Sequence, residues 1–127
     1  MILHLDTQVV VRLYAGDRDH FPSRAVAALD HGRLVYSPVV ELEVQYLYEI
    51  GRITAGPEVI FPYLADRTGL APDDTPYLVV VREARRLTWT RDPFDRLITA
   101  AALASGRPLL TRDRAIRDHY ADAVWDD

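Results

Sequence analysis

The sequence of 127 residues contains no cysteine, no lysine and no asparagine. Without cysteine the chain has no disulfide, no thiolate zinc site and no cysteine nucleophile. Without lysine it lacks the residue with which P-loop proteins bind nucleotide phosphates. The same absence argues against phosphoacceptor receiver domains and haloacid-dehalogenase-type phosphatases, whose acidic sites also use a lysine. These enzyme and binding classes are therefore excluded at the outset.

Long apolar segments are missing as well. No uncharged apolar run approaches the roughly 20 residues of a membrane span, so we expect no membrane association. The first residues do not follow the basic, apolar and small-residue order of a secretory signal, which favours a cytoplasmic location. With 49% hydrophobic and 27% charged residues, the chain has the composition of a globular protein. We expect one domain covering residues 1–127.

Charge is distributed unevenly along the chain. Residues 82–117 hold nine arginines against four acidic residues, whereas residues 1–81 hold six against eleven. A basic segment of this kind suits a polyanionic partner such as a nucleic acid. Arginines that pair locally on helix surfaces explain the same pattern equally well, so both interpretations stay open.

Short apolar runs alternate with helical segments throughout. The expected strands are 2–6, 34–36, 70–71, 108–111 and 123–125. The expected helices are 7–14, 23–32, 38–50, 57–67, 93–105 and 112–120, together with one that Asp73 or Asp74 caps and that ends near Leu87. This alternation indicates an α/β fold in which helices cover both faces of a parallel sheet of four to five strands.

Two aspartates directly follow expected strands. Asp6 ends the first apolar run, and Asp113 comes just after 108–111. In parallel α/β sheets, ligands bind beyond the carboxyl ends of the strands, so these carboxylates are expected at one edge. Each aspartate is also placed to cap the helix that follows it, which is the structural alternative to a role in a site.

Glu43 occupies an unusual place in the helix 38–50, which Ser37 is expected to cap. On a helical wheel it falls in the middle of an apolar arc formed by Val39, Val40, Leu42, Tyr46, Leu47 and Ile50. A carboxylate among core residues is costly unless it is compensated. Its partner must be an arginine, a proton or a metal ion. Glu41 is the competing acidic residue, but it lies on the polar side of the wheel.

A third acidic segment opens the helix 93–105. Asp92 is placed to cap this helix, and Asp95 follows three residues later, a spacing that is also typical of capping. On the wheel Asp95 borders the apolar stripe formed by Phe94 and Ile98. A border position can reach an open cleft, so we assign Asp95 to a site and Asp92 to the cap.

Taken together, these segments resemble the PIN-domain ribonucleases, especially the VapC-like toxins of type II toxin–antitoxin pairs. The resemblance rests on Leu5-Asp6-Thr7, on Ser37-Pro38-Val39-Val40-Glu41-Leu42-Glu43-Val44, on Asp92-Pro93-Phe94-Asp95-Arg96, and on Leu109-Leu110-Thr111-Arg112-Asp113. It implies a three-layer α/β/α domain and metal-dependent endonucleolytic cleavage of RNA. The catalytic metal ligands that it implies are Asp6, Glu43, Asp95 and Asp113, supported by Thr7, Asp92 and Thr111.

The resemblance also implies a cofactor and partners. The cofactor would be Mg²⁺, with Mn²⁺ as a substitute, because both are hard cations that prefer oxygen ligands. The partners would be an RNA substrate, a cognate antitoxin and a second copy of the chain in a homodimer. Arg96, Arg112 and Arg114 flank the carboxylates and would contact RNA phosphates or form structural ion pairs. The alternative function is a non-catalytic PIN-like module that binds RNA or a protein without cleavage.

Overall fold

A computed structural model describes residues 1–126, and its centre is a parallel sheet. Within these residues the sheet has five strands in the order β3-β2-β1-β4-β5, all of them parallel. The strands are β1 (Ile2–Leu5), β2 (Arg33–Tyr36), β3 (Ala71–Pro72), β4 (Leu109–Leu110) and β5 (Ala123–Val124). The central strand β1 buries Leu3 and Leu5 completely. A strand covered on both faces is expected to be apolar throughout, as this one nearly is.

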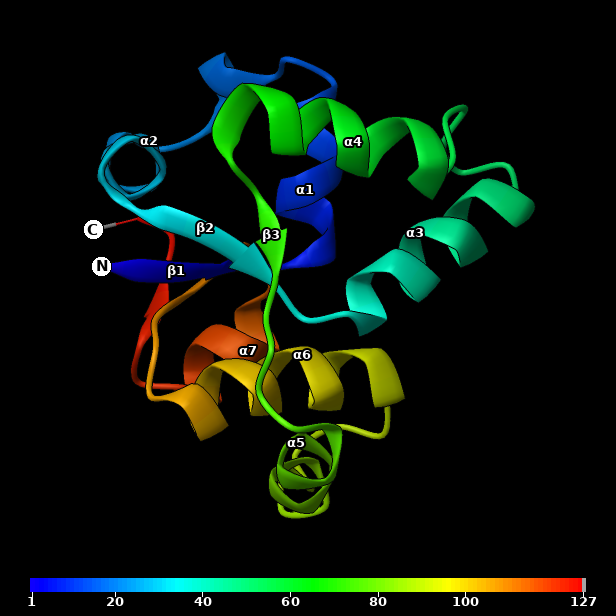
Figure 1. The fold of residues 1–127 in the computed structure, drawn as a ribbon. Coiled ribbons are helices and arrows are strands. Elements are labelled where there is room, and N and C mark those ends of the chain that lie inside the picture. The colour runs from blue at the N-terminus through cyan, green and yellow to red at the C-terminus, as the bar shows by residue number, and fades with distance from the viewer. Residues whose placement is uncertain (127) are drawn as a thin grey trace.

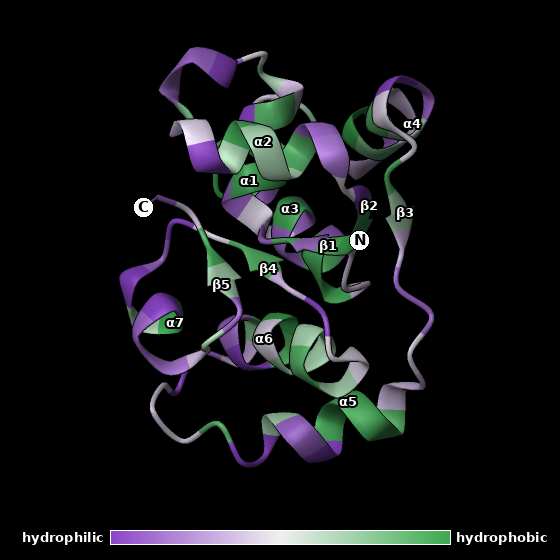
Figure 2. Ribbon diagram, turned by 90° about the vertical axis from the view of Figure 1, so that its left-hand side faces the viewer, coloured by the Kyte–Doolittle hydropathy of each residue, from purple (hydrophilic) through white to green (hydrophobic). Residues whose placement is uncertain are grey.

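Helices form a layer on each face of the sheet (Figures 1 and 2). One layer consists of α1 (Thr7–Tyr14), α2 (Ser23–His31) and α4 (Pro57–Thr68), with a short 3₁₀ helix at Arg18–His20. The other consists of α6 (Pro93–Ser105) and α7 (Arg114–His119), and α5 (Tyr77–Ala84) packs on the side of α6 that faces away from the sheet (Figures 1 and 2). The predicted three-layer α/β/α architecture is confirmed. No helix in the described part of the chain is long and apolar enough to cross a membrane.

Helix α3 (Val39–Glu49) lies beyond the carboxyl edge of the sheet and contacts α1, α4 and α6 (Figure 1). Its buried face consists of Val40 and Val44. Leu42, Tyr46 and Ile50 are 60%, 49% and 49% exposed, so the expectation that the whole apolar arc is buried was wrong. An edge helix is covered on one side only, and Glu43 therefore lies at the border of the buried face rather than in its middle.

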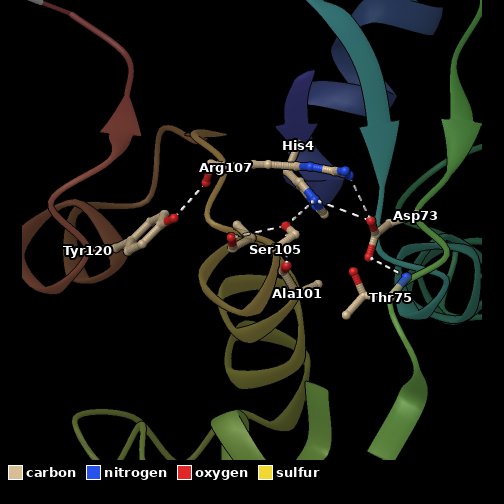
Figure 3. A network of polar contacts seen from close by, with 8 residues as sticks. His4, Asp73, Thr75, Ala101, Ser105, Arg107 and Tyr120 are labelled. Carbon is tan, nitrogen blue, oxygen red and sulfur yellow. Dashed lines mark hydrogen bonds and ion pairs between the residues drawn. The ribbon is translucent and has the colours of Figure 1, made fainter. Parts of the chain in front are cut away.

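Two expected helix caps differ in the structure. Helix α3 begins at Val39 with Pro38 in the cap position. No side chain caps α3, so the expectation that Ser37 caps it was wrong. Asp73, one of two candidates to cap α5, makes no cap hydrogen bond to that helix. It is buried instead among His4, Ser105 and Arg107, in a network that links β1 to residues far along the chain (Figure 3).

Candidate functional site

The carboxyl edge of the sheet carries a cavity of about 480 Å³. It is formed at the ends of β1 and β4, the two central neighbours of the sheet, and by the facing parts of α3 and α6. The side chains that line it are Asp6, Thr7, Gln8, Arg12, Glu43, Asp92, Asp95, Arg112 and Asp113. The structure thus brings together all four carboxylates that the sequence assigned to a site, with Asp92 as a fifth.

Asp6 lies at the base of this acidic cavity and is 7% exposed. Its Oδ1 accepts a hydrogen bond from the backbone N–H of Thr7 at 2.8 Å. Its Oδ2 accepts one from Thr111 Oγ1 at 2.6 Å. Burial raises the pKa of Asp6, and the charges of Asp113 and Asp92 raise it further, although both hydrogen bonds oppose the change. Asp6 therefore caps α1 and also lines the cavity, so its two predicted placements coexist.

Glu43 reaches the cavity from α3 and is partly buried. Its Oε1 accepts a hydrogen bond from Thr7 Oγ1 at 2.5 Å, which joins α3 to the start of α1. Burial raises the pKa of Glu43, as do the charges of Asp6 and Asp92. Glu41 does not line the cavity, and its Oε2 instead accepts from the hydroxyl of Tyr36 at 2.6 Å. The choice of Glu43 over Glu41 agrees with this geometry.

The amino-terminal turn of α6 contributes two aspartates. Asp92 caps the helix: its Oδ1 accepts from the N–H groups of Phe94 and Asp95, at 2.8 and 3.3 Å. The Asp95 carboxylate is partly buried, and its pKa is raised to about 7, first by burial and then by the charge of Asp92. Asp113, Asp6 and Glu43 add smaller contributions of the same sign. Every other carboxylate that lines the cavity thus raises the pKa of Asp95.

Asp113 stands at the rim, where it caps α7 by accepting from the N–H of Ile116 at 3.0 Å. Its own N–H donates to Thr111 Oγ1 at 3.0 Å. Thr111 is completely buried and donates to Asp6, so one hydroxyl connects the aspartates that follow β1 and β4. The hydroxyls of Thr7 and Thr111 thus orient two of the carboxylates, those of Glu43 and Asp6.

The three arginines that flank the carboxylates in sequence have different positions in the fold. Arg112 lines the acidic cavity. Arg96 does not, because its Nε donates to the backbone carbonyl of Thr90 at 2.8 Å. Arg114 faces a different cavity on the far side of α7. Of the three, only Arg112 is positioned beside the acidic cluster.

Two residues of α1 were missed by the sequence reasoning. Gln8 and Arg12 both line the acidic cavity, and Arg12 also forms an ion pair with Asp17 at 3.4 Å. They are four residues apart, which places them on one face of the helix that begins at Thr7. That spacing, together with the position of Asp6 at the start of the helix, was the available signal.

None of the five carboxylates forms an ion pair with an arginine in the described part of the chain. Of the three partners expected for a buried carboxylate, arginine is thus excluded, and a proton or a metal ion remains. The donors are all oxygen atoms, which is the ligand set that Mg²⁺ and Mn²⁺ prefer. Among residues 1–126 no three acidic or histidine side chains are grouped closely enough to hold a metal ion as they stand. Uncompensated carboxylates repel one another, so separated side chains are the arrangement expected without a cation.

Comparison with known proteins gives a family and a fold. The family model of the PIN domain matches residues 3–121. No curated protein matches the chain. Among solved structures, the chain is similar to one in the crystal structure of VapBC2 from Rickettsia felis bound to a DNA fragment from their promoter. The TM-score is 0.68 at 15% sequence identity, and the likeness covers 99% of this chain and 98% of that one. At this identity the likeness concerns the fold alone.

Proposed function

We propose that this chain, which belongs to the PIN domain family, is a metal-dependent endoribonuclease and the toxin of a toxin–antitoxin pair. One observation carries the catalytic part of the proposal. Carboxylates from four separate segments of the chain converge on one cavity, and within residues 1–126 none of them forms an ion pair with an arginine. A fold that stabilised itself alone would pair or disperse these charges, because buried like charges destabilise the native state.

The residues that would hold Mg²⁺ or Mn²⁺ are Asp6, Glu43, Asp95 and Asp113. When bound, the cation would supply positive charge that stabilises the charge developing on the scissile phosphodiester. Thr7 and Thr111 would keep Glu43 and Asp6 in place through the hydrogen bonds described above. Such supporting contacts fix the orientation of ligands and contribute to metal affinity.

Arg112 and Arg12 would contact the phosphates of the RNA at the border of the acidic cavity. Both side chains line it, and a guanidinium can bind two phosphate oxygens at once. They would also offset the repulsion between the RNA backbone and the carboxylates. Gln8, on the same face of α1, offers both a donor and an acceptor to the substrate.

The toxin role is supported by the fold likeness to the chain from the VapBC2 structure. By that likeness the chain would bind a cognate antitoxin. A homodimer is supported by apolar side chains left exposed on α3 and α5, of which Leu42 and Tyr77 line one cavity: Leu42, Tyr46, Tyr77, Leu78 and Val79. Light scattering should give twice the mass of one chain, and a monomer across micromolar concentrations would contradict the dimer.

An RNA cleavage assay tests the catalytic proposal. The purified chain, free of any co-purified inhibitor, should cut RNA with Mg²⁺ or Mn²⁺ and stop when the cation is chelated. The Asp6→Asn variant should lose this cleavage. Asp66→Asn is its matched control and should keep it, because Asp66 is exposed on α4 and does not line the cavity. If the wild-type chain binds RNA but does not cut it with either cation, it is the non-catalytic module.

In cells, expression of the chain alone should arrest growth, because no antitoxin would be present to inhibit it. The Asp6→Ala variant should relieve this arrest, whereas Asp66→Ala should not. Immunoblotting must show equal amounts of the variants. Equal toxicity of wild type and Asp6→Ala would contradict the proposed role of the acidic cavity.

A further inference from the structure

A second cavity, of about 290 Å³, lies between α2, α7 and the residues that follow β5. Its lining combines arginines and aspartates with one aromatic residue: Arg24, Arg114, Arg117, Asp118, Ala123, Trp125 and Asp126. Trp125 is 8% exposed and packs edge-to-face on Phe21, with 5.6 Å between the ring centroids. The wall of this cavity therefore belongs to the hydrophobic core, and the guanidinium groups surround a fixed surface.

Asp126 already places anionic oxygen in this arginine cavity. Its carboxylate accepts a hydrogen bond from Arg117, and its backbone carbonyl accepts one from Arg24 at 3.0 Å. Arginines from two different helices thus bind oxygen atoms of one residue, as they would bind the oxygens of a phosphate. The side chain of Asp126 is 55% exposed, so a ligand arriving from solvent can displace it.

Arg114 gives the cavity additional positive charge. It is exposed, and it forms no ion pair with any residue in the range 1–126. Asp118 also lines the cavity and is likewise outside these ion pairs. When the carboxylate of Asp126 moves away, three guanidinium groups face one remaining carboxylate among the residues 1–126 that line the cavity.

The arginine cavity and the acidic cavity both border α7 or its cap residue. Asp113 caps this helix and lines the acidic cavity, while the next residue, Arg114, lines the arginine cavity. Arg112 faces the acidic side of this boundary. A polyanion that occupied the acidic cavity would therefore meet Arg112 first and the arginine cavity directly beyond α7.

We propose that Arg24, Arg114 and Arg117 form a phosphate subsite for the RNA strand, in which Asp126 is an internal competitor. This inference rests on the proposed function, since it takes RNA as the ligand. The subsite holds a backbone phosphate outside the segment being cut, so it contributes to affinity and not to base recognition. Asp126 lowers that affinity because it must leave before the phosphate enters.

The test is the binding of a fluorescently labelled single-stranded RNA, measured by anisotropy on the full chain in the cleavage-silenced Asp6→Asn background. Arg117→Gln and Arg114→Gln should each weaken binding by about tenfold, as expected for a charge-assisted hydrogen bond. Each should also reduce the slope of log K against log salt by about 0.7, the value for one phosphate contact on a single strand. Arg33→Gln is the control, because Arg33 is exposed at the start of β2 and lines neither the acidic cavity nor the arginine cavity.

Removal of the Asp126 charge should increase the affinity for RNA, whereas loss of the arginines lowers it. Asp126→Asn should tighten RNA binding more than Asp122→Asn, which removes an equal charge from an exposed residue outside the cavity. Combined with Arg117→Gln, the Asp126→Asn gain should largely disappear, because the competitor acts through Arg117. An ion pair that only stabilised the fold would give no gain in affinity. Arg114→Gln breaks no ion pair, so its result is not confounded by misfolding.

Several results would overturn the subsite. These are equal affinities of the Arg114, Arg117 and Arg33 variants, no gain from Asp126→Asn over Asp122→Asn, or no RNA binding by the background chain. Loss of antitoxin binding with unchanged RNA affinity would assign the cavity to a protein partner instead. Cleavage by the wild-type chain is scored separately. A chain that cuts RNA without the expected binding pattern loses only the subsite, and one that shows the pattern without cutting loses only the catalytic proposal.

Discussion

Two buried aspartates of this fold have opposite surroundings. Asp73 is 6% exposed and Asp6 is 7% exposed. The Oδ1 atom of Asp73 lies 3.2 Å from Arg107 Nη1 and 3.7 Å from His4 Nε2, and its Oδ2 accepts from the N–H of Thr75 (Figure 3). Asp6 receives hydrogen bonds from Thr7 and Thr111 but forms no ion pair within the described chain. Its cavity holds four further carboxylates against two arginines.

The surroundings of Asp73 therefore stabilise its charge, whereas those of Asp6 destabilise it. Arg107 compensates the charge of Asp73, so this network links β1, β3 and the end of α6 at little electrostatic cost. Burial and like charges instead raise the pKa of Asp6. The native state must offset this destabilising arrangement elsewhere, as proteins do at functional sites. We therefore expect substitutions at the two aspartates to affect different properties.

The largest expected effect is on cleavage. Asp6→Asn should reduce the rate of RNA cleavage by at least about 100-fold, because even residues that only support metal ligands contribute 10–100-fold. Its melting temperature should be maintained or raised, since a repelled charge is removed. Asp73→Ala should show the reverse, with cleavage retained and about 1–3 kcal/mol of stability lost as Arg107 loses its partner. Loss of stability in Asp6→Asn with normal cleavage would invert the assignment.

The buried threonine beside Asp6 should have the next largest effect. Thr111→Val keeps the shape of the side chain but removes the hydrogen bond to Asp6 Oδ2 and the acceptor for the N–H of Asp113. We expect cleavage to fall about 10–100-fold at limiting Mn²⁺, with partial recovery at high Mn²⁺, since orientation of the ligands is lost rather than a ligand. Thr99→Val is a suitable control, because Thr99 is also buried but has no hydrogen-bond partner for its hydroxyl in residues 1–126. Equal effects of the two valines would contradict the supporting role.

The arginines allow a smaller test. Arg112→Gln should weaken RNA binding by about tenfold in the Asp6→Asn background, the effect of one charged hydrogen bond. Arg96→Gln should change it much less, because Arg96 is bound to the carbonyl of Thr90 and does not line the cavity. Anisotropy titrations at two salt concentrations measure both variants. Equal losses would show that RNA follows a different path over α6.

The smallest effect concerns stability and pH. The pKa of Asp95 rises from 3.8 to about 7 in the folded chain, so the folded state binds this proton more tightly than the unfolded state. The stability that this proton gives is complete below pH 3.8 and is lost as the pH rises through 7. Without a divalent cation, the difference in stability between Asp95→Asn and wild type should therefore grow in favour of the variant from pH 4 to 8. Urea denaturation curves measure it, and a difference independent of pH would contradict the raised pKa.

The surroundings of Asp6 could be predicted from the sequence, whereas those of Asp73 could not. Asp6 and Asp113 follow strands, and the carboxyl ends of parallel strands meet at one edge, so their proximity was predictable. The surroundings of Asp73 were not, because its partner Arg107 is 34 residues away and no local pattern relates them. A loop acid near a helix start suggests a cap, and that interpretation failed here.

The helix that carries Glu43 shows a second limit. A helical wheel tells which residues share a face, but it does not tell whether another layer covers that face. Leu42 and Tyr46 proved exposed, whereas Val44 proved buried. Glu43 still reached the acidic cavity because the border between the buried and exposed faces points toward α1. Arg12 and Gln8 were missed because their spacing shows that they share one face of α1, but it does not by itself show that this face points toward the carboxylates.

The most direct test of the central claim is calorimetric titration of the full chain with Mn²⁺ at pH 7.5. If the carboxylates around Asp6 are arranged for a cation, wild type and Asp73→Asn should bind Mn²⁺ with saturation, and Asp6→Asn should lose that binding. Absence of binding by the wild-type chain, or equal binding by Asp6→Asn, would contradict the account.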